Sequence, residues 1–404
     1  MNYIELPKLY YADKENYEVE YQRRFTSPDT TRLNFRVKGN NAFFVQNTEV
    51  SNLVFQILKT DKAITMLGSG LPGVAHDQFA KRCLIDEIVL TNRIEGVHST
   101  RREIAAVLND LEVTVRGSNK RKRFWGLVNQ YYKLKSKEYA ELKTCNDVRR
   151  LYDELVLYEV VEENPENTPD GELFRKGSTS IHSVTDKEIH RGLYPETAIV
   201  EGLEKALIFL NDESVEKLFR IAVFHYLLEY IHPFYDGNGR LGRFIVSNML
   251  TQELNPLLAY RISYTITENI NRYYKAFETC NATNNLGDLT PFLLMMLEMI
   301  KTSSLELEEN LRALHARLAH YTGVLEKLTN GADNRSKEAY FILTQAGLFS
   351  EYGLSTKEYN DSLGCSYTTG RKELDAIDAK NLLTKRRIGR ENYYMINLEA
   401  LDAI

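Results

Sequence analysis

Cysteine, tryptophan and proline are scarce in this sequence, which has four, one and nine of them among its 404 residues. The cysteines, Cys83, Cys145, Cys280 and Cys365, are widely scattered and show no paired spacing. We therefore expect reduced thiols rather than a disulfide framework, a zinc site or a redox pair. The sequence also lacks an apolar run of membrane-spanning length, and residues 1–14 carry charges where a signal peptide needs an apolar stretch. These absences predict a cytoplasmic protein without membrane contact.

A strong excess of one charge sign is missing as well. The net charge is −5, with 43% hydrophobic and 26% charged residues, which is typical of an ordinary soluble globular protein. Such a balance gives no global electrostatic reason to expect nucleic-acid or anionic-membrane binding. The length allows two or three domains and a sizeable core.

The most informative segment covers residues 232–243 and reads His-Pro-Phe-Tyr-Asp-Gly-Asn-Gly-Arg-Leu-Gly-Arg. Apolar spacing predicts a buried helix over residues 215–231, and a second helix whose apolar face comprises Leu241, Phe244, Ile245 and Met249. The turn between them then lies at a helix N-terminus. Glycines there let the main chain approach an anion, and free amides with the helix dipole favour phosphate.

Four side chains of this segment have chemistry suited to a bound nucleotide. Arg240 and Arg243 are three residues apart and leave nearly one face of the helix, so we expect them to grip successive phosphates. Asp236 offers the single carboxylate that Mg²⁺ needs beside substrate phosphates. A neutral His232 can take a proton from an attacking hydroxyl. A glycine turn and a loop histidine are each commonplace, but their combination in twelve residues favours an active site.

The segment resembles the signature of Fic-domain proteins, His-x-Phe-x-Asp/Glu-Gly-Asn-Gly-Arg-x-x-Arg, with every fixed position filled. The resemblance implies a transferase that moves AMP from ATP to a Ser, Thr or Tyr hydroxyl of a protein target and releases pyrophosphate. It makes His232 the general base and Asp236 the ligand of Mg²⁺. It assigns nucleotide phosphate binding to Gly237, Asn238, Gly239, Arg240 and Arg243.

A second segment, Thr91-Asn92-Arg93-Ile94-Glu95-Gly96, lies at the end of a helix expected from residue 79 onward. It resembles the inhibitory motif Ser/Thr-x-x-x-Glu-Gly/Asn of self-restrained Fic proteins. The resemblance implies that Glu95 pairs with Arg243 and excludes productive ATP, with Thr91 on the same helix face. The alternative is a solvated glutamate on a helix. In some family members the same glutamate orients a water that removes AMP from the target, and the sequence leaves that reaction open.

Two further regions match places where the family builds parts of its site. Residues 174–195 have hairpin-like composition and resemble the flap that aligns the target by strand pairing, although an ordinary surface hairpin fits equally. Tyr264, Asn271, Tyr273 and Tyr274 fall where the adenine pocket forms, because aromatic faces stack on a base. Among these we assign base binding to Tyr274.

The chain organises into four predicted regions. Residues 1–100 form an N-terminal region, mixed and loop-rich to about residue 75, that ends in the inhibitory helix. Residues 101–300 form the catalytic domain and residues 301–334 a helical linker. Residues 335–404 resemble a winged helix-turn-helix domain, with helices over 336–346, from 355 and over 368–377, then a hairpin over 382–394. The predicted fold class is mostly α, a Fic helical core with a small β-hairpin flap, plus this winged-helix domain.

The last region supports a hypothesis of another class, a DNA-binding transcriptional regulator. Thr368, Thr369, Arg371 and Lys372 would lie at the front of a recognition helix and the basic hairpin on phosphates. Acidic residues on the same helix favour a protein-interaction or dimerisation module instead. The target's identity, self-modification and homodimerisation stay open at this point.

Overall fold

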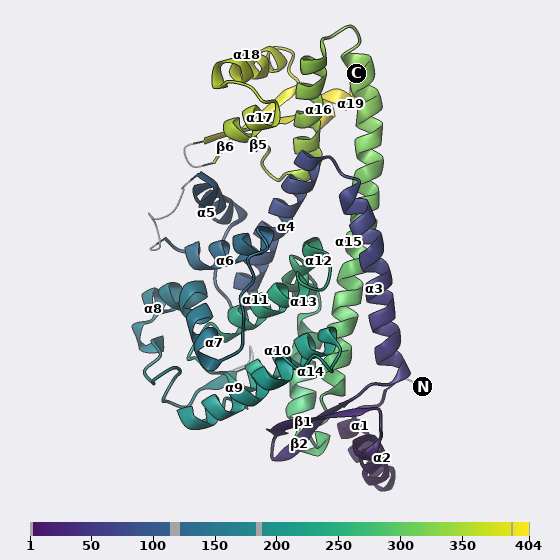
Figure 1. Ribbon diagram of the computed structural model, residues 1–404, viewed down its shortest axis with the longest axis vertical. Helices are drawn as coiled ribbons and strands as arrows, with labels where there is room; N and C mark the ends of the chain where they lie inside the picture. The colour runs from purple at the N-terminus through teal and green to yellow at the C-terminus, as the bar shows by residue number, and fades with distance from the viewer. Residues whose placement is uncertain (1–2, 114–121, 183–187, 389–390, 404) are drawn as a thin grey trace.

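The computed structural model describes residues 3–113, 122–182, 188–388 and 391–403. It is mostly helical, as predicted, with small antiparallel sheets (Figure 1). The tips of the two expected hairpins, residues 183–187 and 389–390, lie outside the described residues.

Two long helices form one side of the molecule. The helix α15 (Thr290–Leu328) and the helix α3 (Thr48–Ser69) run side by side in the same direction (Figure 1). The Asn47 side chain caps α3 by accepting from the Val50 amide, and buried residues such as Ile57 and Ile64 line the face against α15. The expectation that residues 1–75 are loop-rich was therefore wrong, because packing against a distant helix stabilises this segment.

The remainder of the N-terminal region packs at one end of α15. Its elements are α1 (Leu6–Ala12), α2 (Lys14–Thr26), β1 (Thr30–Val37) and β2 (Asn40–Val45). The two strands pair antiparallel, and Phe43 on β2 bridges to Asp288 just before α15. This contact ties the N-terminal hairpin to the start of the long helix.

The central helices surround α10 (Lys217–Ile231), which is buried almost all round because it packs against α9, α11 and α15. The elements before it are α4 (Gly73–Ile94), α5 (Arg101–Val113), α6 (Trp125–Lys135), α7 (Cys145–Tyr152), the π-helical turn η1 (Asp153–Leu157), α8 (Tyr158–Glu163), η2 (Pro165–Asn167), β3 (Ser180–His182), β4 (Glu188–Arg191) and α9 (Glu196–Leu210). Those after it are α11 (Asn238–Leu250), α12 (Pro256–Ala259), α13 (Ile262–Glu268), α14 (Ile270–Asn281) and η3 (Thr283–Asn285).

The chain ends in what we call the C-terminal unit, residues 334–402. It contains α16 (Asn334–Phe349), β5 (Leu354–Ser355), α17 (Thr356–Ser362), α18 (Tyr367–Asp378), β6 (Leu383–Ile388), β7 (Glu391–Ile396) and α19 (Leu398–Asp402), with sheet order β5-β7-β6. Ser355 and Glu358 form a capping box at the start of α17. The elements follow the expected order, while assignment of the unit as a winged helix stays a prediction.

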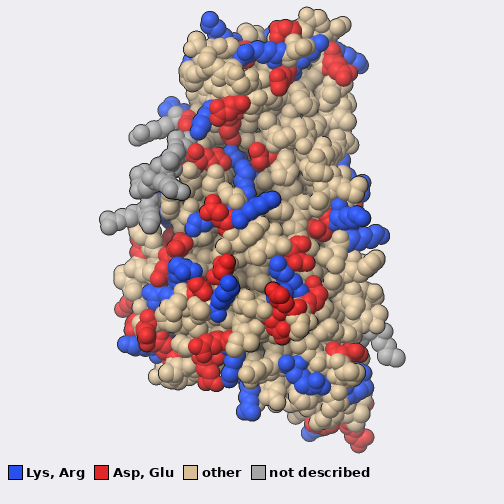
Figure 2. Space-filling model, viewed as in Figure 1, with Lys and Arg blue, Asp and Glu red and all other residues tan. Residues whose placement is uncertain are grey.

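The charge distribution on the surface and the state of the cysteines agree with what the composition predicts. Basic and acidic side chains intermingle over the face shown in Figure 2. All four cysteines are free, and Cys83, Cys145 and Cys280 are buried. Among the helices that the structure describes, none combines the length and apolar character that a membrane span needs.

Candidate active site

Residues 232–237 join α10 to α11, and residues 238–243 form the start of α11, as the glycines predict. His232 directly follows α10 with a left-handed φ of 52°. Gly237, with a φ of 81°, precedes the first residue of α11, and a Cβ there would crowd Tyr152 and Val156. This position therefore requires glycine for both its backbone angle and its surroundings.

The first turn of α11 offers main-chain amides that no side chain caps. The Asn238 side chain is already engaged, since its Oδ1 accepts from the Phe234 amide at 3.0 Å and its Nδ2 donates to the Phe234 carbonyl at 2.9 Å. Because both polar atoms of its side chain are engaged, Asn238 can offer a ligand its main-chain amide. The unpartnered amides and the helix dipole make this turn suited to an anion.

Arg243 is held by the end of α4. Its Nη2 donates to Glu95 Oε1 at 2.8 Å and to the Thr91 carbonyl at 3.1 Å, and its Nε donates to Thr91 Oγ1 at 2.8 Å. Burial has the largest single effect on the pKa of Arg243 and lowers it, but the charge and hydrogen bond of Glu95 act together with Tyr273 and Glu229 to raise that pKa above its ordinary value. The structure thus brings together Thr91, Glu95 and Arg243, the three residues that the resemblance to an inhibitory motif links.

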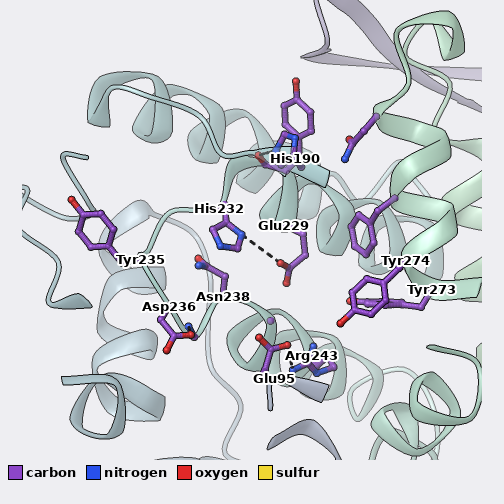
Figure 3. Close-up of a pocket in the computed structure, with 15 residues that line it drawn as sticks. Glu95, His190, Glu229, His232, Tyr235, Asp236, Asn238, Arg243, Tyr273 and Tyr274 are labelled. Carbon is purple, nitrogen blue, oxygen red and sulfur yellow. Dashed lines mark hydrogen bonds and ion pairs between the residues drawn. The ribbon is translucent and has the colours of Figure 1, made fainter. Parts of the chain in front are cut away.

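The Glu95 carboxylate also lies on the first turn of α11. A Cβ added to Gly239 would overlap the carboxylate of Glu95 before anything else. Figure 3 shows Glu95 beside Arg243 at this turn. A carboxylate therefore occupies the position that the amides and Arg243 would otherwise offer to a phosphate.

His232 faces the same pocket from the opposite side (Figure 3). Burial, followed by the charge of Arg175, lowers its pKa to about 3, so the imidazole is neutral. Arg175 is fully buried, and its Nε donates to the His232 carbonyl at 2.9 Å while its Nη2 donates to the Leu193 carbonyl at 2.8 Å. Arg175 precedes β3 in the chain and Leu193 follows β4. The Arg175 side chain therefore links the His232 backbone to both ends of the segment that contains these two strands.

Glu229 is a pocket residue that the sequence analysis missed. Its Oε2 lies 3.8 Å from His232 Nδ1, and Glu229 Oε1 and His232 Nδ1 are both buried without a hydrogen-bond partner. Burial, together with the nearby charge of Glu95, raises the pKa of Glu229 to about 8. Its position three residues before His232, one helical turn away, is a signal that could have revealed it.

Asp236 lines the pocket just before the first turn of α11 (Figure 3). Its Oδ1 accepts from the Gly237 amide, which fixes the side chain beside the turn. In the described part of the chain, no group of three or more His, Cys, Asp or Glu side chains is placed to hold a metal. A lone carboxylate next to a phosphate-binding turn nevertheless fits Mg²⁺ that takes its other oxygens from substrate and water.

Arg240 departs from expectation. We predicted that Arg240 and Arg243 bind successive phosphates. In the structure the two arginines form ion pairs with different glutamates, Arg240 with Glu159 and Arg243 with Glu95. Arg240 is 1% exposed, its Nη1 lies 3.2 Å from Glu159 Oε2, and it is absent from the residues that line the described pocket. The helix α11 is buried all round at this point, and Glu159 on α8 accepts from Arg240 Nη1. Arg240 Nε and Nη2 are buried without a hydrogen-bond partner in the described part of the chain, and phosphate binding by Arg240 stays a prediction.

The far end of the pocket is aromatic, with Tyr230, Tyr273, Tyr274 and Phe277 in its lining. Tyr264 is 37% exposed and outside this lining. Of the four residues expected around a base, the structure brings Tyr273 and Tyr274 together and leaves Tyr264 and Asn271 elsewhere.

Asn281 also lines this end, and the sequence analysis did not single it out. The Tyr226 hydroxyl donates to Asn281 Oδ1 at 2.7 Å, which fixes the amide and leaves Nδ2 as its donor group. Its spacing of seven from Tyr274, two turns along one helix face, is the signal that could have found it.

Part of this site falls in a segment of the chain that is similar to known proteins. Residues 144–250 match the Fic/DOC family, a segment that includes residues 232–243 and excludes Thr91 and Glu95. The chain is 33% identical over 98 residues to protein adenylyltransferase fic-1 of Caenorhabditis elegans, covering 24% of this chain and 18% of that protein. It is 34% identical over 100 residues to protein adenylyltransferase Fic of Nematostella vectensis, covering 23% and 21%. The chain thus spans about a fifth of the length of these curated relatives.

Among solved structures, a Fic family protein from Desulfovibrio desulfuricans G20 has a similar fold. The TM-score is 0.52 at 20% identity, and the match covers 87% of this chain and 96% of that one. At this identity the likeness concerns the fold alone.

Proposed function

We propose, from the match of residues 144–250 to the Fic/DOC family, that this chain is a protein adenylyltransferase that is inhibited by its own Glu95. The observation that carries the proposal is that His232 and the uncapped amides of α11 face one pocket. A neutral base and an anion-binding turn on facing sides of a cavity suit transfer of a phosphorus-linked group to a hydroxyl. The adenylyltransferase names of two partial relatives favour AMP as the group transferred.

The proposed reaction is an in-line displacement. The target hydroxyl oxygen attacks the α-phosphorus of ATP, and the bond from that phosphorus to the bridging oxygen of the β-phosphate breaks. His232 accepts the hydroxyl proton, and pyrophosphate leaves with the bond electrons. The α11 amides and Arg243 stabilise the charge on the phosphates. Mg²⁺ held by Asp236 would neutralise part of that charge when bound.

The direct test uses the Glu95→Gly variant with MgATP and lysate proteins as acceptors. Peptide mass spectrometry is expected to find single adenylate additions on Ser, Thr or Tyr side chains, with an equal amount of pyrophosphate released. Absence of adenylated peptides, with the variant folded and supplied with ATP, would reject the proposed activity.

The pH dependence of this reaction follows from the lowered pKa of His232. A base is active when unprotonated, so a pKa of about 3 keeps His232 active well below neutrality. An ordinary histidine with a pKa of about 6.5 would lose roughly nine tenths of its base form at pH 5.5. We expect the initial rate of the Glu95→Gly variant, at saturating ATP, to change less than about twofold between pH 5.5 and 7.5. A tenfold acid loss with a midpoint near neutrality would contradict the assignment.

Nucleotide recognition depends in this proposal on the aromatic end of the pocket. Stacking of a base on an aromatic ring contributes about 1–3 kcal/mol. We therefore expect Tyr274→Ala to raise KM for ATP about tenfold while kcat changes little, because the contact is made equally in the ground and transition states. The matched control is Tyr264→Ala, which removes a tyrosine outside the pocket lining. Equal KM values for the two variants would contradict base binding at Tyr274.

Removal of AMP is a second candidate reaction at the same site. The Glu95 side chain is 25% exposed while its Oε1 binds Arg243, so a carboxylate is present in the pocket that could act as a base toward water. The test is release of AMP from a purified adenylated target. We expect release by the unmodified chain and loss of release in Glu95→Gly if this reaction operates.

DNA binding by the C-terminal unit stays a prediction. The predicted recognition helix α18 carries charges of both signs, since Arg371 lies 3.9 Å from Asp375 and Glu373 pairs with Arg335. Binding to duplex DNA that weakens steeply as salt rises would support a regulator. No binding at low salt would reject it.

A further inference from the structure

The helix α4 connects the C-terminal unit to the active-site pocket. Its first half packs along α16 of that unit, and its last turn carries Thr91 and precedes Glu95 (Figure 1). From Gln78 to Glu95 it spans roughly 25 Å at 1.5 Å per residue. Residues 74–94 of α4 contain no glycine or proline, the usual causes of a kink, so a displacement of one end of the helix is transmitted to the other end.

The N-terminus of α4 takes its cap from the C-terminal unit. Pro72 stands at the N-cap position and supplies no side-chain hydrogen bond. The Ala75 amide, one of the free amides of the first turn, instead donates to Gln345 Oε1 on α16 at 3.0 Å. Gln345 is 2% exposed, so loss of this contact would leave a buried amide without a partner.

A second contact lies one turn further along α4. The carboxylate of Glu358 on α17 accepts from Gln78 Nε2 at 3.0 Å and pairs with Lys81. Lys81 also lies 2.7 Å from Glu112 on α5, so one ammonium joins three elements. The ring of Phe79 meets that of Phe349 edge-on at 6.4 Å between centroids. The first two turns of α4 are thus held by polar and apolar contacts from α16 and α17.

The other end of α4 is held by the active site, with an anchor between the two. Glu87, midway along α4, accepts from the Ser263 amide at 2.8 Å and from the Ser263 hydroxyl at 2.7 Å. Arg243 binds the Thr91 main-chain carbonyl as well as the Glu95 carboxylate, so the position of the α4 backbone itself determines how Arg243 is held. A tilt about Glu87 would move both ends in opposite directions.

We propose that the C-terminal unit sets the strength of the inhibition: its contacts with the start of α4 keep the end of α4, and so Glu95, in the blocking position. The inference rests on the proposed function, because inhibition by Glu95 is part of it. It assigns the C-terminal unit a regulatory role over the pocket. Breaking the contacts at Gln345 and Glu358 releases Arg243 and admits ATP phosphates.

The test is the double variant Gln345→Leu/Glu358→Gln in the full chain. Glutamine at 358 keeps the capping box of α17 while removing the charge that pairs with Lys81. We expect the rate of AMP transfer to rise about fivefold over the unmodified chain, and to stay unchanged when the same pair is added to Glu95→Gly. The matched control is Glu103→Gln, the same substitution in a capping box with Thr100, which is expected to leave the rate unchanged.

A second readout does not depend on activity. Hydrogen exchange of the amides of residues 88–95, which reports local opening, is expected to be several-fold faster in the double variant than in Glu103→Gln. Unchanged exchange in this segment would overturn the inference, as would an equal rate increase in the Glu95→Gly background. An inactive Glu95→Gly variant would instead reject the proposed function, and the exchange measurement would still decide the role of the C-terminal unit.

Discussion

Replacing Glu95 with glycine is expected to raise the rate of AMP transfer by roughly 10- to 100-fold, which is the range of a coupling energy of about 1.4–3 kcal/mol. The physical reason is that Glu95 holds Arg243 and lies on Gly239 at the anion-binding turn. Without it, both the guanidinium and the amides are free for phosphates. The measurement is the initial rate of adenylate incorporation at fixed ATP and acceptor concentrations.

The Glu95→Gln variant separates the contribution of the negative charge of Glu95 to the inhibition from the contribution of its size. The amide fills the same space but brings no negative charge to Arg243, so we expect a rate between those of the unmodified chain and Glu95→Gly. Asp77→Asn is the control on the same helix, because Asp77 is 61% exposed and 3.7 Å from Lys135, away from the pocket. Rates for Glu95→Gly no higher than for Asp77→Asn would contradict self-inhibition.

Replacing His232 with alanine is expected to lower the transfer rate by about 10²- to 10⁴-fold, the usual contribution of a positioned general base. The loss should appear in kcat, with KM for ATP little changed, because His232 acts on the target hydroxyl and the phosphates are held by α11. The measurement is best made in the Glu95→Gly background, where the starting rate is highest.

The control for this loss is His320→Ala, a substitution of an exposed histidine on α15. Thermal unfolding of His232→Ala should resemble that of the parent, since His232 Nδ1 has no hydrogen-bond partner within the described residues. A His232→Ala variant that is folded and retains more than about a tenth of the rate would contradict its role as base.

The centre of the site could be predicted from the sequence because its signals are local. The signals are Gly237, Gly239 and the apolar spacing on either side of them, and each of these acts within a few positions of the chain. The predicted helix start at the Gly-Asn-Gly turn is therefore confirmed, since α11 begins at Asn238. The end of α4 near Glu95 was predictable for the same reason, with Gly96 in a left-handed conformation just after it.

The parts that sequence reasoning missed depend on distant partners. The helix α3 is stabilised by packing on α15, which lies more than two hundred residues later in the chain. Arg240 pairs with Glu159 on α8, 81 residues earlier in the chain, and no local pattern reveals that pairing. The hydrogen bond from the Ala75 amide to Gln345 also cannot be predicted from the residues around Pro72, because Gln345 lies 270 residues later in the chain. Two further pocket residues, Glu229 and Asn281, could have been predicted from the sequence, because helical spacing places them near His232 and Tyr274.

The most direct measurement of the central claim labels ATP on either the α- or the γ-phosphate and follows the label into protein. Incubating Glu95→Gly with MgATP and acceptor proteins is expected to attach the α label covalently, to leave the γ label in free pyrophosphate, and to lose the α signal when His232→Ala is added. Attachment of the γ label, or no attachment of either label by a folded variant, would contradict AMP transfer at this site.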